Sequence, residues 1–132
     1  MIFTYRRVTS QLGRPVIPII LKSRQKFILG SALIDSGSDC CVFNTQTAKI
    51  LSVGLSSKSR TIKGIGSELV NGKWGALIIK VAGKSYKIKA LFVDTVDVSQ
   101  GILGTKGFFD HFDVKLSYRK RVIEILPALR VS

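Results

Sequence analysis

Short segments rich in β-branched and aromatic residues recur along the whole chain, and residues typical of turns separate them. Three neighbouring pairs of such segments predict hairpins: 16–21 with 27–35, 76–81 with 86–93, and 114–117 with 121–125. This pattern is typical of a small all-β domain, either a barrel or a sandwich, and it excludes a helical bundle. A chain of 132 residues is long enough for one such domain with one core, and too short for two.

Helix and turn signals add a few elements between these hairpins. Asn44 is a typical helix-capping residue, so we expect a short helix over 45–52 that ends near a left-handed Gly54. The Asn-Gly pair at 71–72 predicts a tight turn. Residues 107–112 predict one or two further helical turns, with phenylalanines on the buried face.

The balance of charges is strongly basic. Lys and Arg number 21 against 8 Asp and Glu, which gives a formal net charge of +13 at pH 7. Such an excess predicts an acidic partner, such as nucleic acid, a membrane surface or an acidic polypeptide, unless the charge is only solvated. No segment resembles a nucleic-acid recognition helix, and the aromatic residues do not alternate with the basic ones in the sequence. The sequence therefore favours a polypeptide partner over nucleic acid, although the charge leaves nucleic acid open.

Metal binding, disulfide bonding and membrane insertion find little support in the sequence. Cys40 and Cys41 are adjacent, and because a bridge between neighbouring cysteines is strained, we expect two free thiols. With His111 as the single histidine and no paired cysteine motif, we expect no metal site. No apolar stretch is long enough to span a membrane, and no signal peptide is visible, so we expect a cytoplasmic location.

The stretch LIDSGSDCC, residues 33–41, ends an apolar run with the carboxylate of Asp35. Aspartate is costly to bury, so a strand that ends in one needs an explanation. One explanation is a turn aspartate that bonds its own backbone. The other is a rigid, partly desolvated catalytic carboxylate, followed by a Gly37 that allows close approach. Two carboxylates about 3 Å apart share a proton and activate water, but this chain has one Asp-Ser-Gly, so a second copy would have to supply the other carboxylate.

Three separated segments together resemble the retropepsins, the single-domain aspartic peptidases of retroviruses and of their cellular and bacterial relatives. ALIDSGSD at 32–39 resembles the catalytic loop, and IKGIGSELV at 62–70 resembles the flap. QGILGTKGFFDHFDVKLSYRKRVIEI at 100–125 resembles the apolar-apolar-Gly segment, the short helix and the last hairpin. The resemblance implies a single domain over 1–132 with its core at about 14–126. It also implies an all-β closed acid-protease barrel with one or two short helices, active as a two-fold symmetric homodimer.

The resemblance also implies roles for individual residues. Asp35 would be the catalytic aspartate, Ser36 would link the catalytic loops of the two subunits, and Gly37 would lie beside the substrate main chain. Asp39 would hold the substrate backbone at the edge of the site, and Ile65 would be the tip of the flap that closes over the substrate. The other substrate-binding positions are Gly64 and Gly66 beside the flap tip and the apolar residues Ile34, Ile102 and Leu103.

Two functions follow from this resemblance and from the departures from it. The first is an aspartic endopeptidase that hydrolyses polypeptides with water activated by an Asp pair shared across a homodimer, without metal or cofactor. The second is a retropepsin-fold binding module with weak or no catalysis, for an acidic protein or nucleic acid. The second is supported by the net charge and by Thr105 and Lys106, which stand where the family often has an arginine that would pair with Asp39.

Overall fold

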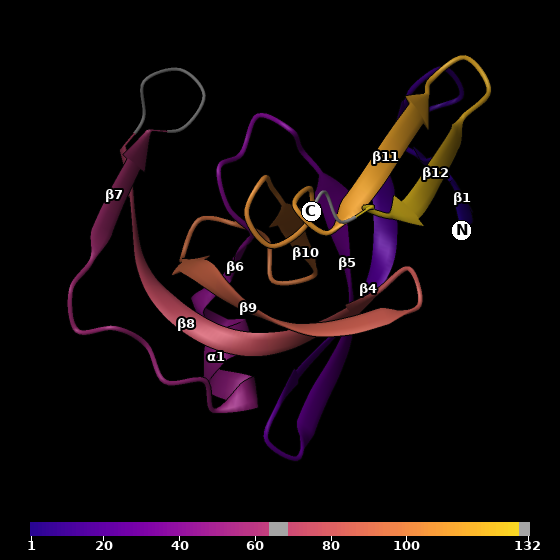
Figure 1. The fold of residues 1–132 in the computed structure, drawn as a ribbon. Helices are drawn as coiled ribbons and strands as arrows, with labels where there is room; N and C mark the ends of the chain where they lie inside the picture. Colours follow the sequence, from indigo (N-terminus) through magenta and orange to yellow (C-terminus); the bar gives the residue numbers. More distant parts are fainter. Residues whose placement is uncertain (64–68, 130–132) are drawn as a thin grey trace.

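The computed structural model describes residues 1–63 and 69–129, and it is built mainly from strands (Figure 1). One sheet of seven strands has the order β4-β5-β10-β6-β9-β8-β7. A further pairing between β4 and β8 closes the first six of these strands into a barrel, and β7 extends from it. The bounds are β4 (Val16–Ser23), β5 (Lys26–Ile34), β6 (Val42–Asn44), β7 (Arg60–Lys63), β8 (Leu69–Val81), β9 (Lys84–Val93) and β10 (Gln100–Leu103). The predicted fold class, an all-β closed barrel, is confirmed.

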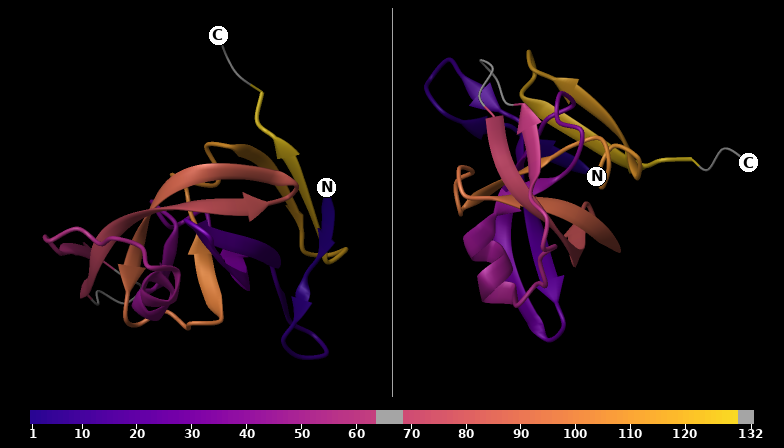
Figure 2. Two further views of the ribbon diagram at one scale, coloured as in Figure 1. Left: turned by 90° about the horizontal axis from the view of Figure 1, so that it is seen from below. Right: turned by 90° about the vertical axis from the view of Figure 1, so that its left-hand side faces the viewer.

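The two ends of the chain form a second, smaller sheet beside the barrel (Figures 1 and 2). Strand β12 (Val122–Pro127) lies between β1 (Ile2–Thr4) and β11 (Phe112–Ser117). The terminal amine of Met1 donates to the carbonyl of Ile125 at 2.7 Å, and the Ile125 amide donates back to the Met1 carbonyl at 2.9 Å. The N-terminal strand, which the sequence patterns did not predict, is therefore paired with the chain's own C-terminal hairpin. A short ribbon of β2 (Arg6–Arg7) and β3 (Gly13–Arg14) follows β1.

All three predicted hairpins are present, as β4–β5, β8–β9 and β11–β12. Their turns use left-handed residues: Arg24, Ala82, Gly83 and Arg121 have φ values of 56°, 49°, 78° and 57°. Left-handed backbone is the conformation that tight hairpin turns require.

The predicted turn at Asn71-Gly72 is wrong, because β8 continues through both residues. Gly72 pairs with Val93 across the β8–β9 ladder. A Cβ at Gly72 would lie 2.7 Å from Cγ of Leu91 and 2.8 Å from Cγ1 of Val93. The glycine therefore serves close packing between neighbouring strands, and it does not mark a turn.

The predicted first helix is present as α1 (Thr45–Leu51), and the Asn44 side chain accepts a hydrogen bond from the Gln46 amide at 2.7 Å. The helix ends close to the expected position, but the left-handed residue at its end is Ser52, with φ of 55°, and not Gly54 as expected. Residues 107–111 form turns, and Phe112 is already the first residue of β11, so α1 is the single helix within the described ranges.

The barrel interior holds the main hydrophobic core. The completely buried side chains there include Ile17, Ile79, Leu103 and Phe108. The ring centroids of Phe108 and Phe112 are 5.3 Å apart. Both phenylalanines are buried in the core as predicted, although Phe108 lies in a turn and Phe112 in β11, and neither lies in a helix. No helix in the described part of the chain is long and apolar enough to cross a membrane.

Candidate active site

Asp35 lies directly after β5, at the point where β5 and β10 run side by side. The two strands are parallel, with Ile34 opposite Leu103, and the Asp35 amide donates to the Leu103 carbonyl at 3.0 Å. The Asp35 carboxylate accepts the Gly37 amide at Oδ1, at 2.9 Å, and the side chain remains partly exposed. The turn-aspartate geometry considered from the sequence is therefore present. It does not compete with a catalytic role, because a carboxylate retains acceptor capacity on its second oxygen.

Backbone hydrogen bonds join the loop after Asp35 to the segment after β10. The amide of Thr105 donates to the carbonyl of Ser38 at 2.8 Å, and the amide of Lys106 donates to the carbonyl of Asp39 at 3.0 Å. These two bonds continue the β5–β10 pairing beyond the end of both strands. The loop that carries the carboxylate is therefore held on both sides of its turn.

Gly104 allows this close contact. A Cβ at Gly104 would overlap the backbone oxygen of Cys40 and would lie 2.6 Å from that of Ser38. The Ser38 hydroxyl also donates to the Cys40 carbonyl at 2.8 Å, which braces the loop from within. The Ile-Leu-Gly segment, residues 102–104, therefore ends in a glycine for a steric reason.

The tip of the loop faces solvent. Ser36 and Gly37 are both exposed, and the Ser36 hydroxyl has no hydrogen-bond partner among residues 1–63 and 69–129. A rigid loop with an exposed hydroxyl and an exposed glycine is suited to contact another polypeptide.

The far end of the loop lacks the ion pair that the resemblance implies. Asp39 is exposed, and Lys106 meets it through a backbone hydrogen bond and not through a side-chain ion pair. Within the described residues the single acid–base contact joins His111 to Asp110, with 3.8 Å between Nε2 and Oδ1. Lys106 therefore does not replace the missing arginine.

The apolar residues expected to line the site divide between two clusters. Ile34 and Leu103 are 4% and 0% exposed and belong to the main core, so they support the loop from below and have little surface left for a substrate. Ile102 points to the opposite face of the sheet, because side chains alternate along a strand. It is partly exposed and packs against a second cluster, made of Cys40, Val42, Leu91 and Val93 together with Trp74 and Val96.

This second cluster is the main feature of the site that sequence reasoning missed. Its members come from β6, β8, β9 and β10, from the loop after Asp35 and from the loop between β9 and β10, so no single stretch of sequence shows it. The cluster depends on the parallel pairing of Val42 with Leu91. The alternation of apolar residues in the sequence does not reveal this pairing, so the sequence carried no signal for the cluster.

The expected flap lies partly outside the described residues. Gly64, Ile65 and Gly66 fall in the undescribed segment 64–68. The strands on either side of it, β7 and β8, pair in antiparallel register, and the Thr61 hydroxyl donates to Oδ1 of Asn71 at 2.7 Å. The base of the hairpin is therefore formed beside the barrel (Figure 1).

The two cysteines have structural positions behind the loop. Both are buried, and neither forms a disulfide. Burial raises the pKa of the Cys41 thiol to about 12, so this side chain is protonated at neutral pH and is a poor nucleophile.

Another titratable group near the loop is Tyr86, which is partly buried. Its hydroxyl donates to the carbonyl of Gly107 at 2.7 Å, and burial raises the pKa of this hydroxyl. Across the described ranges, no group of three or more His, Cys, Asp and Glu side chains is placed to hold a metal ion.

A closed six-stranded barrel with an Asp-Ser-Gly loop braced by an Ile-Leu-Gly segment defines a retropepsin-like fold. Solved structures match it, and three of them illustrate the likeness. The EIAV protease complexed with the inhibitor HBY-793 is 25% identical, with a TM-score of 0.58 over 77% of this chain and 88% of that chain. A retropepsin-like aspartic protease from Rickettsia conorii is 16% identical, with a TM-score of 0.61 over 93% of this chain and 86% of that one.

The third match is the retroviral protease-like domain of Ddi1 from Leishmania major, 16% identical, with a TM-score of 0.57 over 88% of this chain and 96% of that chain. No protein-family profile matches the sequence, and no curated protein matches it. The retropepsin-like fold that the sequence motifs predicted is thus confirmed by structural similarity.

Proposed function

We propose that this chain is an aspartic endopeptidase whose active unit is a homodimer. The observation that carries the proposal is the position of Asp35. Its backbone is fixed to Leu103, its carboxylate is partly exposed, and it follows a core strand of a fold shared with retropepsin-like proteases. A solubilising surface aspartate does not need a bracing segment on its loop, whereas a catalytic carboxylate requires a supported one.

The dimer follows from the number of carboxylates. The sequence contains one Asp-Ser-Gly, and hydrolysis by activated water in this class of site uses two carboxylates that share a proton. A two-fold axis beside the exposed tip at Ser36 and Gly37 would bring Asp35 and its copy together. The exposed hydroxyl of Ser36 is then available to donate to a backbone carbonyl of the second copy.

In the proposed mechanism one carboxylate of the pair is ionised and the other is protonated. The ionised carboxylate removes a proton from water as the water oxygen attacks the scissile carbonyl carbon. The protonated carboxylate donates its proton to the carbonyl oxygen, which gives a neutral tetrahedral diol. As the diol collapses, its C–N bond breaks, one carboxylate accepts a hydroxyl proton, and the amine leaves with a proton from the pair. No covalent bond to the enzyme forms.

The substrate in this proposal is an extended polypeptide. Asp39, exposed at the end of the loop, would accept hydrogen bonds from substrate amides, and the second cluster around Ile102 would contact apolar side chains next to the cleaved bond. Gly64, Ile65 and Gly66, which lie outside the described residues, would contact the substrate as the flap.

Cleavage of an unbiased peptide library, read by mass spectrometry from mildly acidic to neutral pH, tests the proposal. The test variant is Asp35→Asn, which keeps an oxygen for the Gly37 amide and so preserves the turn. Asp113→Asn, an exposed carboxylate on β11, is the matched control. We expect cuts from the wild type and from the control, and none from Asp35→Asn.

Two results would contradict the proposal. Cleavage by Asp35→Asn at the wild-type rate would remove Asp35 from the mechanism. A wild-type dimer that cuts nothing at any pH would favour the binding module. The lack of a side-chain ion pair between Asp39 and Lys106 also supports that module.

A further inference from the structure

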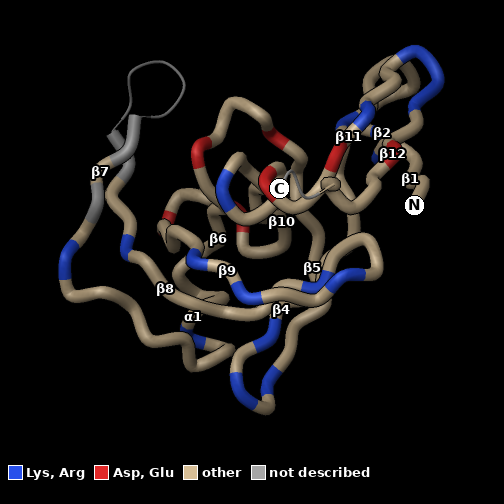
Figure 3. Tube along the Cα trace, in the orientation of Figure 1, with Lys and Arg blue, Asp and Glu red and all other residues tan. Residues whose placement is uncertain are grey.

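Six basic residues gather at one end of the molecule, where the β2–β3 ribbon meets the β11–β12 turn. We call this region the basic tip; its cations are Arg6, Arg7, Arg14, Arg119, Lys120 and Arg121. Figure 3 shows the basic segments close together there, around β2 and the end of the β11–β12 hairpin. Neither 5–14 nor 117–121 contains an acidic residue. The tip is therefore a local concentration of positive charge, and not only a share of the net excess.

The two parts of the tip are joined by specific contacts. The Tyr5 amide donates to the Arg121 carbonyl at 3.0 Å, and the Tyr118 hydroxyl donates to the Gln11 carbonyl at 3.2 Å. The rings of Tyr5 and Tyr118 meet edge to face, with centroids 5.8 Å apart. The guanidinium carbon of Arg121 lies 3.7 Å from the centre of the Tyr118 ring, and its N–H groups donate to the carbonyls of Tyr118 and Gln11. Arg121 therefore holds the tip together.

The other five cations have no such engagement. They are exposed, and their side chains have neither an ion pair nor a hydrogen bond within residues 1–63 and 69–129. Arg6 lies directly opposite Arg14 in the β2–β3 ribbon. Like charges directly opposite each other destabilise a strand pair, and a bound anion would remove that repulsion.

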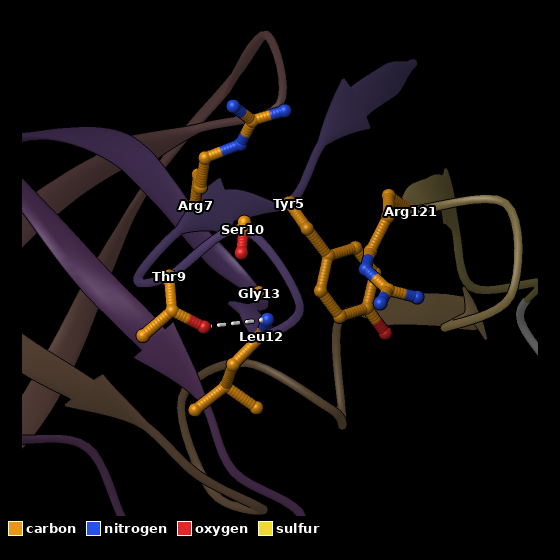
Figure 4. Close-up of a pocket in the computed structure, with 7 residues that line it drawn as sticks. All are labelled: Tyr5, Arg7, Thr9, Ser10, Leu12, Gly13 and Arg121. Atoms are coloured by element: carbon orange, nitrogen blue, oxygen red, sulfur yellow. Dashed lines mark hydrogen bonds between the residues drawn. The ribbon is translucent and has the colours of Figure 1, made fainter.

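A cavity of about 300 Å³ lies within the tip (Figure 4). It is lined by Tyr5, Arg7, Thr9, Ser10, Leu12, Gly13 and Arg121, none of which carries a negative charge. Oγ1 of Thr9 already accepts the amides of Gln11 and Leu12, at 3.2 and 3.0 Å, so its O–H proton is free to donate. Guanidinium and hydroxyl donors together match the oxygens of a phosphate group.

We propose that the basic tip binds the phosphodiester backbone of nucleic acid, with one phosphate at the cavity and its neighbours against Arg6, Arg14 and Arg119. Five of the six cations are arginines, whose planar fork binds phosphate in a bidentate manner. Tyr5 and Tyr118 are far apart in the sequence, but the fold brings their rings together among these arginines. Tyr118 is 47% exposed and can therefore contact a base. This activity is separate from the proposed peptidase and does not depend on it.

Fluorescence anisotropy with the full chain tests the proposal, using a labelled single strand and a labelled duplex of about 20 nucleotides over a series of salt concentrations. The test variant is Arg6→Glu/Arg119→Glu. The control is Arg24→Glu/Lys58→Glu, which changes the net charge equally at two exposed positions outside the tip. Each lost phosphate contact is worth about fivefold in affinity at about 0.1 M salt on a single strand, so we expect the test variant to bind about 25-fold more weakly. We expect the control to stay within about threefold of the wild type.

An equal loss in both variants would overturn the proposal, because net charge alone would then explain binding. Absence of binding by the wild type at low salt would also overturn it. Tip-dependent binding to phosphatidylserine vesicles without binding to nucleic acid would assign the tip to a membrane surface and reject nucleic acid. Thermal melts check that the test variant folds; if it does not, Arg6→Gln/Arg119→Gln replaces it, with Arg24→Gln/Lys58→Gln as the control.

Discussion

Replacing Gly104 with alanine is the sharpest perturbation of the candidate site that substitutes none of its functional side chains. The added Cβ would overlap the carbonyl oxygen of Cys40 and lie 2.6 Å from that of Ser38. Both obstacles are backbone atoms, so no side-chain rotation relieves them. The loop that carries Asp35 must move away from the segment after β10.

The magnitude follows from what this movement costs. Overpacking of a tight contact costs about 1–3 kcal/mol. Separation also weakens the hydrogen bonds from the amides of Thr105 and Lys106 to the carbonyls of Ser38 and Asp39, which contribute about 1 kcal/mol each. We therefore expect Gly104→Ala to lower the free energy of unfolding by about 2–4 kcal/mol. Peptide cleavage should fall even where the protein remains folded, because the carboxylate is displaced.

Urea denaturation and peptide cleavage, measured on the same preparations, check this prediction. Gly30→Ala is the matched control: Gly30 lies in β5, the strand that leads to Asp35, and a Cβ there would meet nothing within 4 Å. We expect the control to be as stable as the wild type or slightly more stable, because alanine reduces the entropy of the unfolded chain. Equal stability and equal activity of Gly104→Ala and Gly30→Ala would refute the steric argument.

Two further predictions concern stability. Asn44→Ala should cost about 1–2 kcal/mol in urea denaturation, because the Asn44 side chain caps α1 through the Gln46 amide and also donates from Nδ2 to the Val96 carbonyl at 2.6 Å; an unchanged midpoint would show that these bonds contribute nothing. Burial raises the pKa of Cys41 from 9.0 to about 12, so the folded state keeps a proton that the unfolded state loses above pH 9. The protonated Cys41 thiol therefore contributes fully to the free energy of unfolding below pH 9, and this contribution is lost between pH 9 and about 12, by up to about 1.4 kcal/mol per pH unit. Thermal melts over this range should show a smaller loss of stability with rising pH for Cys41→Ala than for the wild type. Equal losses in the two proteins would contradict the assignment.

The sequence predicted the hairpins and α1 because their signals are local. A turn residue between two β-rich segments, or a capping Asn44 before a helical segment, acts through neighbours within a few positions. The errors arose where distant packing decided the outcome. Gly72 resembles a turn residue in its own context, and only the side chains of Leu91 and Val93 explain why it lies inside a strand.

The same distinction holds for the candidate site. The Asp35 loop was predictable from a short motif, and the bond between its carboxylate and Gly37 is local. The bonds from the segment after β10 to Ser38 and the cluster around Ile102 join segments that are far apart in the sequence. Hydrophobic patterns also do not show which apolar residues are buried beneath a site, so Ile34 was expected to line it.

The central claim, that two chains build one active site, is tested most directly by mixing wild-type and Asp35→Asn chains in equal amounts, unfolding them together and refolding them. If each site needs Asp35 from both copies, only dimers of two wild-type chains are active, and random pairing makes these about a quarter of all dimers. Peptide cleavage should then fall to about a quarter of that of the same total amount of refolded wild type. A value of about half would mean that each wild-type chain acts alone or with any partner, and it would contradict the shared carboxylate pair.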